Sequence, residues 1–145
     1  MRIRTIAVAG TLSLLAITGL AGTAQAAGDA EAGEKAFNKC RACHSLAEGK
    51  RMIGPSLNGL FNRKAGNAEG FKHSADMTAA GAKIDPWDET HFKAYIATPS
   101  EYIGAQIGKP KATTKMVFPG IKSEKEIEDL YAFLEPYLKG EKQGK

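Results

Sequence analysis

The sequence predicts an all-α domain of about four to five short helices joined by long loops. Signals for the start of a helix occur at Asp29, Asp85, Thr98 and Ser123. By contrast, the stretch 45–84 has little periodicity and is rich in Gly, Asn, Ser and Lys. Loops longer than about 12–15 residues are uncommon inside compact domains, so a long unstructured stretch needs an additional component to pack against.

The stretch Cys40-Arg41-Ala42-Cys43-His44 supplies that component. A Cys-x-x-Cys-His run is typical of c-type haem attachment. The two thiols add across the two vinyl groups of the porphyrin, the spacer sets the span between them, and the adjacent imidazole reaches the iron. The motif therefore predicts one haem c bound covalently through Cys40 and Cys43, with His44 as an axial ligand.

Other chemistries of the two cysteines remain alternatives at this point. A thioredoxin-like redox pair normally opens a helix after a strand, whereas the residues before Cys40 have a helical pattern. A structural zinc site needs two further ligands, and His73 and His91 lie far from the cysteines in the chain. A plain disulfide is a third possibility.

Residues 1–26 have the three parts of a cleaved secretory signal. Basic residues at 2 and 4 precede an apolar run from about residue 5 to 20, and small residues end at Ala26. The alternative is a retained membrane anchor, but the run contains Gly, Thr and Ser and is short for a span of ~20 residues. We expect cleavage before Ala27 and a periplasmic protein, because bacteria attach haem covalently outside the cytoplasm.

Residues 27–145 then form a single domain, within the common range of about 100–150 residues. Removing the signal lowers the formal net charge from +4 to +2, because Arg2 and Arg4 are lost and no acid is. That balance argues against a nucleic-acid partner, which would require a strongly basic face.

The first and last helices have the clearest sequence signals. Asp29 is a good N-cap for a helix running to Lys39, and small Gly33 and Ala36 beside Phe37 favour a close crossing with another helix. The last helix begins with the capping box at 123–126. Its apolar residues recur at helical spacing: Ile127, Leu130, Tyr131, Leu134 and Leu138. We expect these two helices to cross, and Pro136 to kink or end the second.

Two shorter helices are expected between them. Asp85-Pro86 predicts a start with Asp85 as N-cap and Pro86 at the first helical position, and Thr98-Pro99-Ser100-Glu101 predicts a capping box for the next helix. Residues 104–114 are a polar, basic loop. In the long stretch 45–84, the side chains expected to pack on the porphyrin are Ile53, Leu57, Leu60, Phe61 and Phe71.

The second axial ligand has several candidates, which are Met52, Met77, Met116, His73 and His91. Met52 is too close to His44 in the chain, and His91 lies within a helical pattern. Met116 follows a flexible loop and is far enough along the chain to approach the opposite face. Core packing is nevertheless the commoner role of a methionine, so spacing alone leaves both roles open for Met116.

Nearly the whole of 27–145 is similar, in the same order, to class I cytochrome c of the mitochondrial and alphaproteobacterial kind. The matching residues are Gly28-Asp29, the haem motif, 54–61, 63–66, Trp87, Tyr95, Thr98-Pro99, Tyr102-Ile103 and 114–121. The resemblance implies the cytochrome c fold and assigns Met116 as the second iron ligand.

The resemblance also implies roles around the haem. Pro55 would accept a hydrogen bond from the His44 ring through its carbonyl. Arg63 and Trp87 would hold a haem propionate, because a partly buried carboxylate needs donors. Tyr95 and Thr114 would form the polar network beside the Met116 sulfur, and Phe118 would lie at the haem edge. Three departures stand out: the long segment 104–113, His73 in place of a tyrosine that binds a propionate, and Met77 near a position often occupied by Asn.

These features predict a soluble periplasmic one-electron carrier rather than an enzyme, because iron with two axial ligands has no open site. A peroxidase or ligand sensor, and a dedicated acceptor for one dehydrogenase, are the alternatives. Expected partners have acidic faces, for example a quinol-oxidising complex as donor and a terminal oxidase or reaction centre as acceptor. We expect a monomer without stable membrane insertion, with a basic rim formed by Lys35, Lys39, Lys109, Lys111, Lys115 and Lys122.

Overall fold

The computed structural model describes residues 28–145, so the predicted signal at 1–26 and its cleavage site lie outside the described residues. Over 28–145 the backbone forms five α-helices and one short 3-10 helix, with no strand. They are α1 (Ala30–Phe37), η1 (Leu60–Asn62), α2 (Ala75–Ala80), α3 (Glu89–Ala97), α4 (Pro99–Gln106) and α5 (Glu124–Leu138). The prediction of an all-α domain is confirmed, and no helix in this range is long and apolar enough to cross a membrane.

The haem motif follows directly after helix α1. The Asp29 carboxylate accepts hydrogen bonds from the N–H groups of Glu31 and Ala32 at 2.9 and 3.2 Å, as expected of an N-cap. The helix ends at Phe37, two residues before the predicted end, and the chain continues in tight turns. In these turns Cys40 N donates to Phe37 O at 2.8 Å and His44 N donates to Cys40 O at 2.9 Å.

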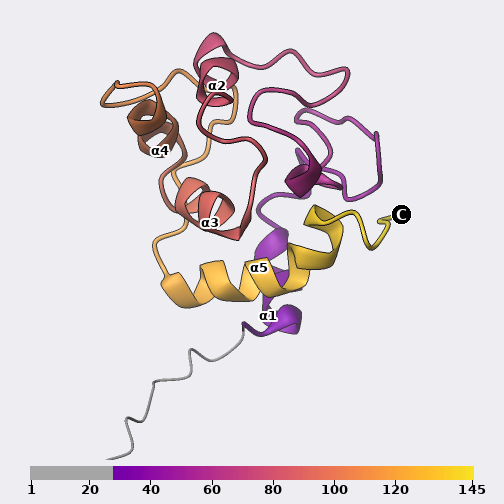
Figure 1. Ribbon diagram of the computed structural model, residues 1–145. Coiled ribbons are helices and arrows are strands. Elements are labelled where there is room, and N and C mark those ends of the chain that lie inside the picture. Colours follow the sequence, from indigo (N-terminus) through magenta and orange to yellow (C-terminus); the bar gives the residue numbers. More distant parts are fainter. Residues whose placement is uncertain (1–27) are drawn as a thin grey trace, which may run out of the picture.

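Helix α5 lies across α1 (Figure 1), as predicted. The contact requires glycine, since a Cβ at Gly33 would lie 1.9 Å from the Asp129 carbonyl oxygen. Beside it the rings of Phe37 and Phe133 pack with centroids 5.6 Å apart. The two termini of the domain are thus joined through one tightly packed interface.

The ends of α5 differ in part from the sequence prediction. Ser123 caps the helix and accepts from Glu126 N at 3.3 Å, but the Glu126 side chain pairs with Lys39 instead of completing the capping box. Pro136 does not end the helix, because α5 continues to Leu138. The Pro136 carbonyl accepts from the backbone of residues 141 and 142 at 2.8 and 3.0 Å, which closes this end.

The two middle helices differ from the prediction in their first turns. Helix α3 begins at Glu89 rather than at Pro86, because Asp88 is the residue that caps it, accepting from His91 N at 2.7 Å. Helix α4 does begin at Pro99, yet the Thr98 side chain makes no capping bond. Glu101, the other half of the expected capping box, pairs with Lys111 at 3.0 Å.

The stretch 45–84 is not entirely loop, because it contains η1 and α2. Ser74 caps α2 and accepts from Met77 N at 3.2 Å. The sequence did not reveal α2 because Ala75–Ala80 has no apolar period; only Ala80 of this helix is fully buried.

Two apolar clusters flank the interior of the domain. One is built on α1, α3 and α5 around Leu130, Leu134 and Leu138. The other lies against α2 and α4 and includes Trp87 and Ile103. The functional cavity lies between these clusters, so residues of both contribute to its lining.

Candidate haem site

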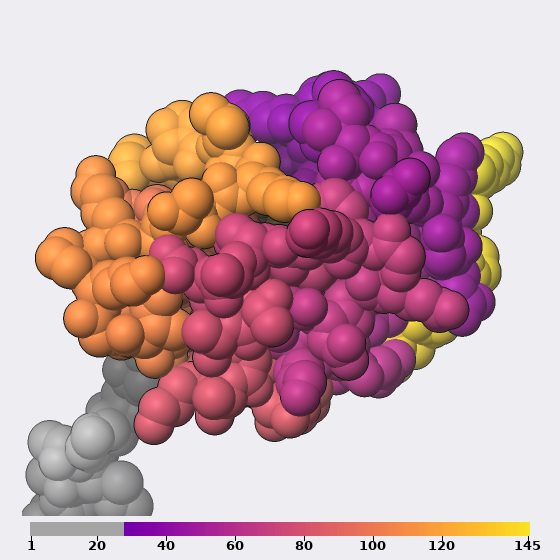
Figure 2. All heavy atoms as spheres, turned by 90° about the horizontal axis from the view of Figure 1, so that it is seen from above, coloured from indigo at the N-terminus to yellow at the C-terminus, as the bar shows by residue number. Residues whose placement is uncertain are grey.

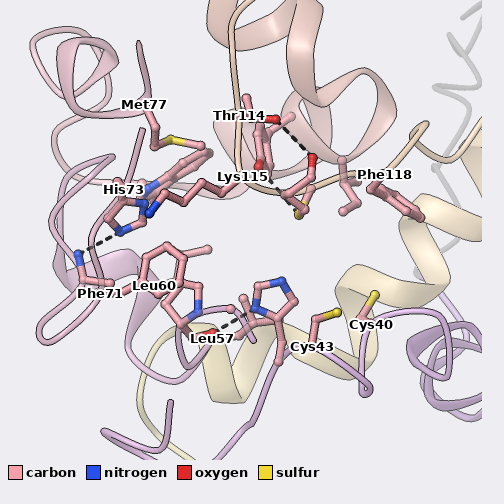
Figure 3. Close-up of a pocket in the computed structure, with 18 of the residues that line it drawn as sticks. Cys40, Cys43, Leu57, Leu60, Phe71, His73, Met77, Thr114, Lys115 and Phe118 are labelled. Carbon is pink, nitrogen blue, oxygen red and sulfur yellow. Dashed lines mark hydrogen bonds between the residues drawn. The ribbon is translucent and has the colours of Figure 1, made fainter. Parts of the chain in front are cut away.

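A cavity of about 340 Å³ opens between the two clusters. Figure 3 shows Cys43 and Leu57 on one wall and Thr114 and Lys115 on the opposite wall. The first wall comes from the segment after α1, and the second from the loop after α4. These long loops are therefore arranged around a common interior, as the sequence predicted.

The two cysteines lie half-buried at the cavity, and both thiols are free. Burial raises the pKa of the Cys40 thiol to about 11, although the neighbouring Lys39 opposes this shift. Cys40 is therefore a neutral thiol at physiological pH rather than a reactive thiolate. This argues against the thioredoxin-like alternative, which depends on a lowered thiol pKa.

The His44 ring is fixed by the backbone that follows it. Its Nδ1–H donates to the Pro55 carbonyl oxygen at 2.8 Å, the contact that the resemblance assigned to Pro55. Gly54 lies directly against the ring, and a Cβ there would be 2.5 Å from His44 Cε1. Burial lowers the pKa of the His44 imidazole, against the effect of the Pro55 hydrogen bond. A neutral ring with its proton on Nδ1 keeps the Nε2 lone pair for a metal.

Met116 lines the cavity from the loop after α4, and two side chains of its predicted network touch it. The Tyr95 hydroxyl lies 3.7 Å from the Met116 sulfur, and Thr114 Oγ1 donates to the Met116 carbonyl oxygen at 3.0 Å. Burial raises the pKa of Tyr95 far above its usual value, so the phenol stays protonated and is the donor in the contact with sulfur.

The other candidate ligands are less well placed. Met52 is 43% exposed and does not line the cavity, and His91 is hydrogen-bonded to Tyr102 away from it. His73 and Met77 do line the cavity. However, His73 Nε2 accepts from Ala68 N at 3.3 Å, and Met77 packs against the cluster around Trp87.

One end of the cavity is electropositive. The Arg63 guanidinium donates to the backbone carbonyl oxygen of Ser56 and, at 3.1 Å, to that of Asn58. Within residues 28–145 it has no acidic partner. Trp87, which is 6% exposed, packs edge-on against Tyr95 at 5.2 Å between centroids. The pKa of His73 is lowered by burial and then by Arg63 and Lys115. A half-buried guanidinium without a counter-charge is suited to an anionic group in the cavity.

The apolar lining partly matches the prediction. Ile53, Leu57, Leu60 and Phe71 line the cavity, and so does Phe118. The expected contact of Phe61 is wrong, because Phe61 packs between the two apolar clusters instead. Sequence reasoning also missed that two leucines of α5 reach the cavity, Leu130 and Leu134. Their spacing of four was the available signal, but it indicates a buried face without saying what that face covers.

A family model described as "Cytochrome c" matches residues 30–136. The chain belongs to the cytochrome c family. It is 42% identical over 118 residues to cytochrome c-554 of Methylosinus trichosporium, covering 81% of each chain. It is 43% identical over 112 residues to cytochrome c2 of Rhodoblastus acidophilus, covering 77% of this chain and 94% of the relative.

Solved structures give the same result for the fold. Cytochrome c2 from Rhodospirillum centenum superposes with a TM-score of 0.68 at 36% identity, covering 76% of this chain and 98% of that one. Cytochrome cH from Methylobacterium extorquens superposes with a TM-score of 0.61 at 39% identity, covering 74% of this chain and 98% of that one. The predicted cytochrome c fold is confirmed.

Family membership decides between the alternatives for Cys40 and Cys43. Cytochromes c bind one covalent haem c, and the spacing of these cysteines fits that attachment. The cavity fits the group as well: free thiols and a neutral imidazole lie on one wall, apolar side chains surround them, and Arg63 offers a charge that has no acidic partner among residues 28–145. The relatives of this chain are electron-transfer proteins, so the protein is an electron carrier. They give no support to the peroxidase alternative.

Proposed function

We propose that this cytochrome c is a periplasmic one-electron carrier whose haem iron is held by His44 and Met116. The observation that carries the proposal is the placement of these two side chains in one cavity, on segments far apart in the chain. His44 is oriented by Pro55 at 2.8 Å, and the Met116 sulfur lies 3.7 Å from the Tyr95 hydroxyl.

When bound, the haem supplies a one-electron change between ferric and ferrous iron, and a thioether ligand favours the ferrous state. The chain's own residues hold and shield it. Cys40 and Cys43 would attach it, and Leu130 and Leu134 would be part of the apolar wall around it. Burial in this apolar interior further disfavours the extra positive charge of the ferric form.

The remaining predicted site residues have supporting positions. We propose that Arg63 and Trp87 bind a propionate, since both line the cavity. The two residues are already held together, because the backbone N–H of Trp87 donates to the backbone carbonyl oxygen of Arg63 at 3.1 Å. Thr114 and Tyr95 would hold Met116 in place, and Phe118 would cover the haem edge between the loop and the cluster around α5.

The proposed location and partners rest on the sequence and on the family. The N-terminal signal at 1–26 supports export, with the mature chain beginning at Ala27. We propose that the mature protein is a monomer that exchanges electrons with acidic-faced redox proteins, such as a quinol-oxidising complex and a terminal oxidase or reaction centre.

Carbon monoxide binding to the reduced holoprotein tests whether the iron is closed. We expect no spectral change with carbon monoxide in the wild type, because both axial positions are filled. Met116→Ala should bind it readily, since one position becomes open. Carbon monoxide binding by the wild type to the same extent as by Met116→Ala would refute the proposed ligation.

A further inference from the structure

We propose that Asp76 is a positioning residue for Met116, an inference that rests on the His44/Met116 ligation proposed above. Asp76 lies in the first turn of α2. One oxygen of its carboxylate accepts from Lys109 Nζ at 2.7 Å, and the other accepts from the backbone N–H of Thr113 at 2.8 Å. Both donors belong to the loop between α4 and Met116, so Asp76 ties this loop to another element.

The loop is first folded back onto α4. A Cβ at Gly104 would be 2.7 Å from the Lys109 carbonyl oxygen, so the two backbones are in close contact. Ala112 is buried, its N–H donates to Ser100 O at 2.8 Å, and the Ser100 hydroxyl donates back to Ala112 O. At Thr113 the chain leaves α4 and bonds to α2 instead.

Met116 itself lies on a span with few anchors of its own. After Thr113, the next backbone N–H that bonds to another element is that of Ile121, which donates to Ile96 O at 2.9 Å. In the described structure no backbone-to-backbone hydrogen bond fixes residues 114–120, and Val117 is fully exposed. Besides the Tyr95 and Thr114 contacts to Met116, the position of its sulfur therefore depends on the two ends of the span, and Asp76 holds the nearer end.

The Asp76 contact is better shielded than the other ion pair of this loop. The Asp76 side chain is 13% exposed and its partner Lys109 is 54% exposed, whereas Lys111 and Glu101 are 71% and 49% exposed and connect the loop only to α4. Exposed pairs contribute little, while a shielded carboxylate with two charge-assisted hydrogen bonds holds its partners more firmly. In Figure 2 the orange residues of the loop lie beside the pink residues of the α2 region, across which this contact runs.

Loss of the Asp76 contact would release the Thr113 end of the span and reduce the fraction of molecules with Met116 on the iron. An added ligand that competes with Met116 reads this fraction directly, because its apparent affinity rises as the closed state becomes less populated. A change in melting temperature alone would not distinguish this role from ordinary loop stabilisation.

The test is imidazole binding to the purified ferric holoprotein, followed by loss of the far-red band of Met–iron ligation. Asp76→Ala should bind imidazole about tenfold more tightly than the wild type. Asp76→Asn can still accept a hydrogen bond from Thr113 N, and Lys109→Gln leaves that bond intact. The imidazole affinities of both variants should therefore lie between those of the wild type and Asp76→Ala. Lys111→Gln, which removes the exposed pair of the same loop, is the matched control and should stay within about twofold of the wild type.

The inference is overturned if Asp76→Ala matches Lys111→Gln. If Asp76→Ala does not fold, Asp76→Asn and Lys109→Gln provide the test. Imidazole affinities of these two variants equal to that of Lys111→Gln would overturn the inference. A failure of the underlying ligation looks different, because the wild type would then bind imidazole as tightly as Met116→Ala does.

Discussion

His44 is positioned by backbone rather than by other side chains. The Pro55 carbonyl fixes its tautomer at 2.8 Å, and Gly54 leaves room for the ring because it has no Cβ. Gly54 and Pro55 are adjacent, so one short turn both orients the imidazole and limits the space around it. The ring cannot shift without moving this turn, which gives a direct test at a single residue.

We predict that Gly54→Ala displaces the His44 ring, since the new methyl group would lie 2.5 Å from Cε1. Overpacking of this kind costs about 1–3 kcal/mol. Gly49→Ala is the control: it has positive φ and costs about 1–2 kcal/mol through backbone strain, but a Cβ there meets nothing within 4 Å. The free energy of unfolding and the visible spectrum should be measured for both. An unchanged spectrum in Gly54→Ala would contradict the prediction.

At the scale of elements, the crossing of α1 and α5 is reinforced by a buried carboxylate. Asp129 accepts from the Asp29 backbone N–H at 2.8 Å and from Lys125 Nζ at 2.7 and 2.9 Å. The Lys125 bond, followed by the Asp29 bond, holds the pKa of Asp129 below its usual value of 3.8 despite the opposing effect of burial. One side chain of α5 thereby fixes the residue that caps α1.

This contact predicts a specific dependence of stability on pH. In acid the unfolded chain binds a proton at Asp129 before the folded chain does, so the stabilisation is complete above about pH 4 and is lost as pH falls further. Asp129→Asn should be less stable than the wild type at pH 7, and the difference in free energy of unfolding should shrink toward pH 2. A difference that stays constant with pH would contradict the prediction.

The sequence was most informative where one residue type has one local role. The Asp29 and Ser123 caps, the close crossing at Gly33 and the haem motif were all readable from residue identity and spacing. Tertiary contacts decided the rest. The residue before the Asp88 cap of α3, Trp87, is bonded through its N–H to Arg63 O, and the Asp76 contact joins residues 33 or more apart with no local signal.

At the scale of the whole molecule, the predicted basic rim is not uniform. Four of its lysines are paired with acids: Lys35 with Glu31, Lys39 with Glu126, Lys109 with Asp76 and Lys111 with Glu101. Lys115 and Lys122 have no such acid in the described residues, and Lys115 lines the cavity. Lys115 and Lys122 are therefore the cations best suited to steer an acidic partner toward the haem.

We predict that Lys115→Gln slows electron exchange with an acidic-faced partner, such as a reaction centre, more than Lys35→Gln does. Each variant changes the net charge by one unit, so any difference between them reports the location of the charge. The difference should fade as ionic strength rises, because the Debye length shortens to about 3 Å at 1 M salt. Equal rates for the two variants at low salt would argue against steering by Lys115.

The ferric absorption spectrum at neutral pH tests the central claim most directly. His44/Met116 ligation predicts a weak far-red band from sulfur on ferric haem in the wild type, and its disappearance in Met116→Ala. Met77→Leu is the matched control, because it changes another methionine of the same cavity and should retain the band. A high-spin wild-type spectrum without the band, or a band that persists in Met116→Ala, would contradict the account.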